Sequence, residues 1–385
     1  MAIDPATAQF LLSPAGDELL RCAGSLTGDL LTKLTALRKQ YPPEVSSAAL
    51  EMLDLRRRGA RKFSRAEEMF FVREALEQSS GEAISRYRAN RFPAGATVLD
   101  VGCGIGGDTV GLASRGPVIA VDRDPVRLAM AERNLQVYGL ADRVRFIHGD
   151  IADLDLETDA VFADPSRRAG GRRSRHIADL NPPLESIRRL ARDIPDCAIK
   201  LSPATPDEEL QSLGGEIEFI SESGECKEAV VWLGGLSTAD RRATLLPHGI
   251  SVTREEVGLI PVRRPGRYLL EPDAGIVRAH FVEQLAWEIG AWRLAEQIAY
   301  LSTNELVASP FVDVYEVIDS MPFSPKVVNR CLRDLDAGKV IVKKRGVPFD
   351  PEEVERRMKV GGSRELILVL TRIGGKAWAL ICSVP

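Results

Sequence analysis

The stretch TVLDVGCGIGG, residues 97–107, decides the fold of this chain. Its first half is a short apolar run typical of a buried strand, and its second half is a glycine-rich turn leading into a helical pattern over 108–114. Glycine lets the backbone approach a ligand closely, and a helix N-terminus presents unpaired N–H groups at the same point. The stretch therefore predicts a strand, a ligand-binding turn and a helix in succession.

Further apolar runs continue this pattern along the chain. They lie at 118–121, 144–147, 160–163, 198–201 and 229–233, and the clearest helical pattern between them covers 125–137. Strands that alternate with helices predict a mostly parallel sheet covered on both faces. We therefore expect an α/β, doubly wound, Rossmann-like domain over residues 91–236.

The flanking regions have a different texture. Residues 1–90 show helical spacing of apolar positions, and Ser64 with Glu67 resembles a capping box that opens a helix. Beyond the sheet domain we expect a small α+β, ferredoxin-like module over 237–310 and a second small α+β domain over 311–385. Amphipathic helices are expected over 277–288 and 324–334, and a hairpin is expected to turn at Gly374-Gly375.

The bulk composition excludes several classes of protein. The 385 residues carry a formal net charge of -4, which excludes a uniformly basic nucleic-acid coat but allows local basic patches. The six cysteines form no CxxC pair and the four histidines lack metal-ligand spacing, so we expect a reducing compartment and no metal. Neither a signal peptide nor an apolar run of about 18 residues is visible, which predicts a cytoplasmic protein without a membrane span.

Acidic residues stand in order at the ends of the first three expected strands. Asp100 closes the first, Asp122 closes the second, and Asp150 follows the third. An acid in the place of Asp122 is expected to bind ribose hydroxyls, and Asp150 is placed to accept a hydrogen bond from an adenine amine. The carboxylate of Asp100 would attract a cationic amino-acid ligand and repel a pyrophosphate.

A nicotinamide-dependent enzyme competes with this interpretation, because Gly102, Gly104 and Gly107 also satisfy the dinucleotide pattern GxGxxG. Asp100 and Asp150 argue against it, as does the segment 164–166, which follows a strand where a methyl acceptor would sit. Together they favour S-adenosylmethionine as the cofactor. The expected cofactor-binding residues are Asp100, Gly102, Cys103, Gly104, Gly106, Gly107, Asp122, Arg123, Asp150 and Ile151.

These residues resemble the class I methyltransferases and, within them, the trimethylguanosine synthase family of RNA cap guanine-N2 methyltransferases. The likeness is carried by CGIGGDT (103–109), VIAVDRDP (118–125), AERNLQVYGL (131–140) and FIHGD (146–150). It implies that the turn at 100–107 holds the methionine moiety, Asp122 the ribose and Asp150 the adenine. The cap enzymes carry proline-proline-tryptophan at the acceptor position, whereas this chain has Asp164-Pro165-Ser166 without an aromatic residue, which puts cap recognition in doubt.

The C-terminal part resembles the THUMP-like module that is fused to related bacterial methyltransferases. The likeness rests on Lys343-Lys344-Arg345-Gly346 and on the apolar run at 366–370, and it assigns residues 311–385 to that module. Because THUMP domains proper bind RNA, the resemblance implies an RNA substrate.

Asp164 and Pro165 are the expected catalytic residues. An exocyclic base amine is a weak nucleophile, and the Asp164 carboxylate and the Pro165 carbonyl could accept its hydrogen bonds while the methyl donor is held in line. The expected substrate-binding residues are Ser166, Arg167, Arg168, Arg172, Arg173 and Lys200, with the arginines forming a phosphate clamp. Gln78, Tyr87 and Arg88 are candidates for a lid over the cofactor.

Two functional classes stay open at this point. The first is a methyltransferase that acts on a base amine in RNA, with DNA, protein or a small molecule as other acceptors. The second is an RNA-binding or assembly module that keeps the cofactor pocket without turnover, which the missing aromatic residue after Pro165 favours.

Overall fold

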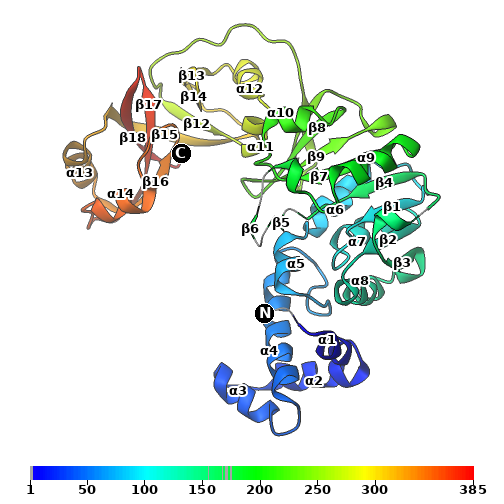
Figure 1. The fold of residues 1–385 in the computed structure, drawn as a ribbon. Helices are drawn as coiled ribbons and strands as arrows, with labels where there is room; N and C mark the ends of the chain where they lie inside the picture. Colours follow the sequence, from blue (N-terminus) through cyan, green and yellow to red (C-terminus); the bar gives the residue numbers. More distant parts are fainter. Residues whose placement is uncertain (1–2, 155, 167, 170–171, 174–175) are drawn as a thin grey trace. The chain divides into compact units, whose positions relative to one another are not determined.

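The computed structural model describes residues 3–154, 156–166, 168–169, 172–173 and 176–385. The chain divides into two compact units. Unit 1 comprises residues 1–218, 228–240 and 246–249, and unit 2 comprises residues 219–227, 241–245 and 250–385. Figure 1 labels the elements along the chain.

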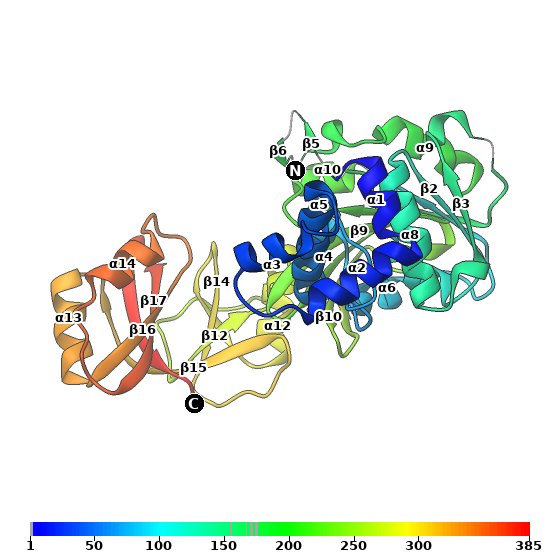
Figure 2. The same ribbon diagram turned by 90° about the horizontal axis from the view of Figure 1, so that it is seen from below.

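Unit 1 begins with six helices. They are α1 (Pro5–Leu11), α2 (Pro14–Ser25), α3 (Leu30–Leu37), α4 (Pro43–Gly59), α5 (Arg73–Gln78) and α6 (Glu82–Ala89). Side chains cap the first three, since Asp4, Ser13 and Asp29 each accept a hydrogen bond from a backbone N–H in the first turn. The first two helices lie beside α8 in Figure 2, and Arg133 of α8 pairs with Asp17 of α2 at 2.8 Å.

A central sheet forms the core of unit 1. Its strands are β1 (Val98–Val101), β2 (Val118–Asp122), β3 (Val144–His148), β4 (Ala160–Ala163), β7 (Cys197–Leu201), β8 (Glu216–Glu222) and β9 (Glu225–Trp232). These are seven strands of a nine-stranded sheet, in which their order is β8-β9-β7-β4-β1-β2-β3, and residues 219–222 of β8 and 225–227 of β9 fall in unit 2. Neighbouring strands from β7 to β3 are parallel, and β9 runs antiparallel to β7. Every residue of β1, β4 and β7 is buried, as expected of a parallel sheet covered on both faces.

The connecting helices are α7 (Gly107–Ala113), α8 (Pro125–Val137), α9 (Leu184–Asp193) and α10 (Asp207–Gln211). Asp124 caps α8 by accepting from the N–H groups of Val126 and Arg127, and Pro125 occupies the first helical position. The expected α/β, Rossmann-like fold is confirmed by this alternation of strands and helices. A strand order that reverses at β1 places the glycine turn at the carboxyl edge of the sheet, where ligands bind in such folds.

Unit 2 is built around a seven-stranded sheet in the order β13-β14-β12-β15-β18-β17-β16. The strands are β12 (Tyr268–Pro272), β13 (Trp292–Ala295), β14 (Ile298–Thr303), β15 (Val312–Pro322), β16 (Ala337–Lys344), β17 (Arg364–Ile373) and β18 (Lys376–Ser383). Its helices are α11 (Ala274–Arg278), α12 (Val282–Glu288), α13 (Pro325–Asp334) and α14 (Pro351–Arg357). The antiparallel pair β10 (Arg241–Leu246) and β11 (Ile250–Thr253) precedes them.

The seven-stranded sheet crosses the boundary expected near residue 310, since β12 pairs with β15. The division of the C-terminal part into modules over 237–310 and 311–385, and the four-part division of the chain as a whole, stay predictions. The expected hairpin is confirmed, because β17 and β18 pair on either side of Gly374 and Gly375.

Two local expectations were wrong. Ser64 opens no helix with Glu67; its N–H and hydroxyl both donate to the distant Glu82 carboxylate, at 2.8 and 2.7 Å, and this tertiary partner replaces the local cap. The helix expected over 277–288 is broken between α11 and α12, where His280 adopts a φ of 61°. Within the described residues, no helix is long and apolar enough to cross a membrane.

Candidate active site

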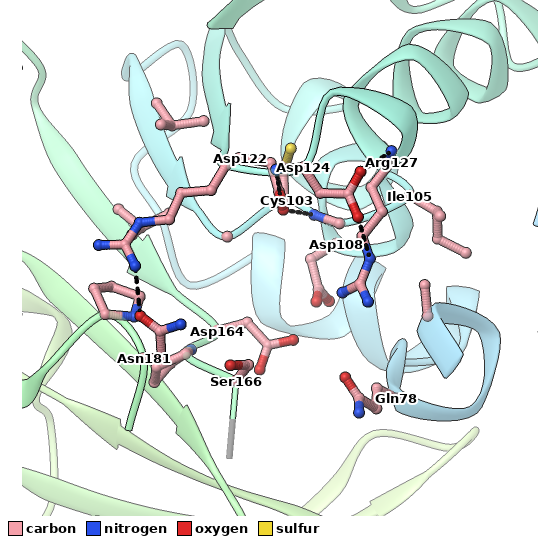
Figure 3. Close-up of a pocket in the computed structure, with 18 of the residues that line it drawn as sticks. Gln78, Cys103, Ile105, Asp108, Asp122, Asp124, Arg127, Asp164, Ser166 and Asn181 are labelled. Carbon is pink, nitrogen blue, oxygen red and sulfur yellow. Dashed lines mark hydrogen bonds and ion pairs between the residues drawn. The ribbon is translucent and has the colours of Figure 1, made fainter. Parts of the chain in front are cut away.

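A cavity of about 330 Å³ lies at the carboxyl edge of the unit 1 sheet (Figure 3). It is bounded by residues 75, 78–79, 101–105, 107–108, 121–124, 127, 149, 151, 164–166 and 181–182. Apart from residues 75, 78 and 79, which belong to or follow α5 (Arg73–Gln78), the lining comes from the ends of β1 and β2 and from segments that follow β1, β2, β3 and β4, and the parallel topology brings these to one edge. The cavity is large enough to hold a small organic ligand.

The glycine turn after β1 forms one wall. Gly102, Gly104 and Gly106 have φ angles of 79°, 55° and 83°, which L side chains rarely adopt. The N–H groups of Gly102 and Cys103 both donate to the Val121 carbonyl, which fixes the turn against β2. The Cys103 thiol is buried, and burial raises its pKa well above the usual value. A thiol of this kind is a packing group rather than a nucleophile.

Asp122 holds the turn from the end of β2. Its Oδ2 accepts from the Gly104 N–H at 2.8 Å and its Oδ1 accepts from the Asp124 N–H at 2.8 Å. The carboxylate lines the cavity with an orientation set by these two backbone donors. This preorganisation suits an acid that is expected to meet ligand hydroxyls.

Asp100 lies behind the turn and is fully buried. Its Oδ2 accepts from the Thr109 hydroxyl at 2.6 Å, whereas its Oδ1 has no partner in the described chain. Burial, reinforced by the Asp108 carboxylate, raises the pKa of Asp100 to about 8. The side chain is therefore predominantly protonated near neutral pH.

Arg123 connects two sides of the cavity. Its guanidinium pairs with Asp150, which also caps the short helix after it, and donates to Oδ1 of Asn181 at 2.7 Å. Figure 3 shows this second bond at the rim of the cavity. Arg123 therefore links Asp150, the acid expected to bind adenine, to Asn181 of the cavity lining.

The acceptor segment 164–166 forms a neighbouring part of the cavity wall. The Asp164 N–H donates to the Val101 carbonyl at 3.1 Å, which places the segment directly beside the glycine turn. Two backbone bonds, at 2.8 and 2.9 Å, join Ser166 to Asn181. Asp164, Pro165 and Ser166 all line the cavity, and no aromatic side chain belongs to its described lining.

A buried cluster of charged residues lies beneath Asp164. The Lys200 ammonium is 2.6 Å from Oδ2 of Asp164 and 3.6 Å from Oδ2 of Asp108. Arg88 pairs with Asp108 and, at 3.1 Å, with Glu228 of β9. These contacts combine residues from α6, α7, β7 and β9 with Asp164, which follows the end of β4.

The structure brings together most of the residues expected from the sequence. Of the expected site residues, the cavity lining contains Gly102, Cys103, Gly104, Gly107, Asp122, Arg123, Ile151, Asp164, Pro165 and Ser166. Asp100, Gly106, Asp150 and Lys200 lie next to it but outside its lining, as far as the described residues show. Gln78 lines the cavity, whereas Arg88 is buried in an ion-pair cluster, a position unsuited to a lid.

The arginine-rich segment is described only in part. Arg168 lies in β5 (Arg168–Ala169) and pairs in backbone register with Arg173 of β6 (Arg172–Arg173). Arg167 falls outside the described residues. Lys343 is engaged within unit 2, since its ammonium lies 2.5 Å from Glu271 and 2.7 Å from the Tyr315 hydroxyl.

Several residues around the site were assigned no role from the sequence. Asp108 follows the glycine turn and looks like an ordinary helix residue, while Asn181 and Glu228 are distant in sequence from every motif. Asn134, within the segment 131–140, is fully buried and bonds to the backbone of Phe70 and Ile105, so it locks α8 to the turn. The signal available in the sequence was an asparagine at a position of this helical pattern where an apolar residue is expected.

Three family descriptions match the chain. Residues 95–203 match the RNA cap guanine-N2 methyltransferase family, residues 312–384 match a THUMP domain-like family, and residues 4–59 match a domain of unknown function. The first of these covers the whole cavity except α5.

Similar proteins cover different shares of the chain. An uncharacterised S-adenosylmethionine-dependent methyltransferase of Mycobacterium tuberculosis (strain CDC 1551 / Oshkosh) is 36% identical over 334 residues, which cover 83% of this chain and 91% of the relative. Trimethylguanosine synthase of Schizosaccharomyces pombe is 36% identical over 96 residues, 22% of this chain and 40% of that protein. A crystal structure of a proposed methyltransferase from Porphyromonas gingivalis W83 superposes with a TM-score of 0.75 over 100% of both chains at 21% identity, which supports the fold.

Proposed function

Because the chain belongs to the class I S-adenosylmethionine-dependent methyltransferases and carries a THUMP-like domain, we propose that it methylates RNA. The proposed acceptor is an exocyclic amine of a base. The observation that carries the proposal is the position of Asp164 and Pro165, which line the same cavity as the glycine turn. Family membership also decides between the two cofactors that the glycine pattern left open, in favour of S-adenosylmethionine.

The residues around the cavity fit this cofactor. The turn at Gly102 and Gly104 leaves a cradle without side chains, and the Asp122 carboxylate is held open toward it by backbone donors. Nearby, the fully buried Asp100 keeps an unpartnered Oδ1. We assign Asp100, Gly102, Cys103, Gly104, Gly106 and Gly107 to the methionine moiety, Asp122 and Arg123 to the ribose side, and Asp150 and Ile151 to the adenine.

Bound S-adenosylmethionine supplies a methyl group that its sulfonium has already activated for transfer. The protein then has to position the acceptor nitrogen and exclude water. The Asp164 carboxylate and the Pro165 carbonyl are the acceptors for the two hydrogens of the amine. These bonds localise the nitrogen lone pair toward the methyl group, and Asp164 can take the proton that the amine releases.

An RNA acceptor is supported by three features. The segment after Pro165 carries Arg168, Arg172 and Arg173 in a short hairpin that starts at the cavity wall. Clustered arginines suit phosphate groups, because guanidinium binds them in a bidentate fashion. The matches to an RNA cap guanine-N2 methyltransferase family and to a THUMP domain-like family favour the same acceptor class.

The proposal is tested with S-adenosylmethionine labelled in its methyl group and total cellular RNA. We expect incorporation that ribonuclease removes and that falls by about 100-fold or more in Asp164→Ala, since general acid–base groups contribute on this scale. Binding of S-adenosylhomocysteine, followed as a rise in Tm, is expected to persist in that variant. The control is Asp142→Ala, at an exposed position outside the cavity lining. Unchanged turnover in Asp164→Ala would remove Asp164 from the mechanism.

A second candidate function is an RNA-binding or assembly module without turnover. Ser166 favours it, because this residue stands where the cap enzymes carry a tryptophan that stacks on the base. RNA binding without methyl incorporation in the same assay would support the module. Incorporation into DNA, protein or a small molecule in place of RNA would keep the enzyme and change the acceptor.

A further inference from the structure

We propose that Lys200 is a positioning residue that holds the Asp164 carboxylate ionised and turned toward the cavity. The inference rests on the proposed function, in which Asp164 accepts a hydrogen bond and a proton from the acceptor amine. Lys200 then acts on Asp164 and does not contact the substrate, as the sequence had suggested it would.

The geometry separates the two faces of the Asp164 carboxylate. Oδ2 accepts from the Lys200 ammonium at 2.6 Å, and Lys200 does not belong to the described lining of the cavity. Oδ1 receives no hydrogen bond from any residue that the structure describes, and the side chain is 25% exposed and lines the cavity. Figure 3 shows the side chains of Asp164 and Asp108, both of which line the cavity. One oxygen is therefore fixed, and the other is available to a ligand.

Lys200 is itself held from several directions. It extends from β7, only 6% of its side chain is exposed, and its ammonium also contacts Asp108 and the Gln78 carbonyl, at 3.6 and 3.5 Å. Asp108 is in turn paired with Arg88, whose guanidinium lies over the Phe162 ring at 4.7 Å from the ring centroid. A lysine with these fixed partners has little freedom to reach a substrate.

The cluster contains more carboxylates than cations. Its ionisable members are Asp100, Asp108, Asp164, Glu228, Arg88 and Lys200, and Asp100 is predominantly protonated near neutral pH. Burial would lower the pKa of Lys200, but Asp164, Asp108 and Glu228 outweigh this effect and raise it, so the ammonium stays charged. Burial raises the pKa of Asp164 above its usual value, as does Asp108, whereas Lys200 and Arg88 oppose the rise.

The signs of these effects make the proposal testable. Removing the Lys200 charge takes away the main opposing influence, so Asp164 would titrate at higher pH. Removing the Asp108 charge takes away a neighbouring carboxylate, so Asp164 would titrate at lower pH. If the residues beneath Asp164 merely filled space, their replacement would not shift the Asp164 titration in these opposite directions.

The direct measurement is carboxyl ¹³C NMR of the full chain labelled at aspartate Cγ, as a function of pH. The Asp164 signal is assigned by its loss in Asp164→Asn. We expect its titration to move to higher pH in Lys200→Met, to stay near the wild-type position in Lys200→Arg, and to move to lower pH in Asp108→Asn. Lys339→Met is the matched control, because Lys339 pairs at 2.8 Å with the exposed Glu365 in unit 2.

The acid limb of methyl incorporation into RNA should follow the same directions, with a loss of about 10- to 100-fold for Lys200→Met near neutral pH. An Asp164 titration that is identical in wild type and Lys200→Met would overturn the proposal. Since Lys200→Met breaks a buried pair and can fail to fold, a shift to higher pH in Asp108→Asn would overturn it independently. If the wild-type protein transfers no methyl group, the proposed function fails. The NMR titration still tests whether Lys200 keeps Asp164 ionised.

Discussion

The α-carbon of Gly102 faces the main-chain carbonyl of Asp164 so closely that a Cβ at Gly102 would lie 3.0 Å from that oxygen. The first residue of the cofactor turn and the first residue of the acceptor segment therefore meet at the carboxyl ends of β1 and β4. The short distance leaves no room for a side chain between the cofactor turn and the acceptor segment.

Gly102→Ala is expected to weaken binding of S-adenosylhomocysteine by about tenfold or more, which corresponds to about 1.4 kcal/mol. The φ of 79° at this position costs an alanine about 1–2 kcal/mol, and the new methyl group also displaces the Asp164 backbone. Isothermal titration calorimetry measures the affinity. The control is Gly139→Ala, with a φ of 69° and open space around its Cβ, which should lose stability but keep affinity. Equal affinity in both variants would contradict the close approach.

Asp100 is expected to make the protein less stable as pH rises. Burial raises its folded pKa from the ordinary 3.8 to about 8, so between these values the folded chain keeps a proton that the unfolded chain has released. The free energy of unfolding therefore decreases with pH in this window, by at most about 1.4 kcal/mol per pH unit from this group.

Asp100→Asn removes this titration and keeps an acceptor for the Thr109 hydroxyl. Chemical denaturation across the same pH window should give a flatter stability profile than wild type, with the largest gain near pH 8. The exposed Asp142→Asn serves as the control and should retain the wild-type slope. Parallel profiles for wild type and Asp100→Asn would show that Asp100 is ionised in the folded protein.

Charge reversal at the hairpin is expected to weaken RNA binding. Arg172→Glu with Arg173→Glu removes two cations from the segment that starts at the cavity wall. If both arginines bind phosphates, the slope of log affinity against log salt should flatten by about 0.7 for each phosphate of single-stranded RNA that is no longer neutralised. A filter-binding series over salt concentration measures this slope. Weaker binding with an unaltered slope would argue against a phosphate clamp.

The fold of unit 1 and much of its site could be predicted because their signals are local. A glycine turn and strand-end acids such as Asp122 lie within short motifs, and the parallel topology then brings them to one edge. The buried cluster could not be predicted, because it depends on contacts between residues far apart in the chain. Ser80, for example, donates to Glu228 across 148 positions.

A tertiary contact explains one local error, and a change of backbone conformation accompanies the other. Ser64 has the spacing of a capping box with Glu67, yet its N–H and hydroxyl both donate to the Glu82 carboxylate. The apolar periodicity over 277–288 is continuous in sequence, but the φ of 61° at His280 ends one helix before the next begins. Propensity and periodicity are weak preferences that such contacts override.

Identification of the methylated nucleoside tests the central claim most directly. RNA labelled by the wild-type protein is digested to nucleosides, and the position of the methyl group is determined by mass spectrometry, with Asp164→Asn treated in parallel. We expect a methyl group on an exocyclic base nitrogen of RNA treated with the wild-type protein, and no such group in RNA treated with Asp164→Asn. A methyl group on a ring carbon or a ribose hydroxyl, or equal labelling by Asp164→Asn, would contradict it.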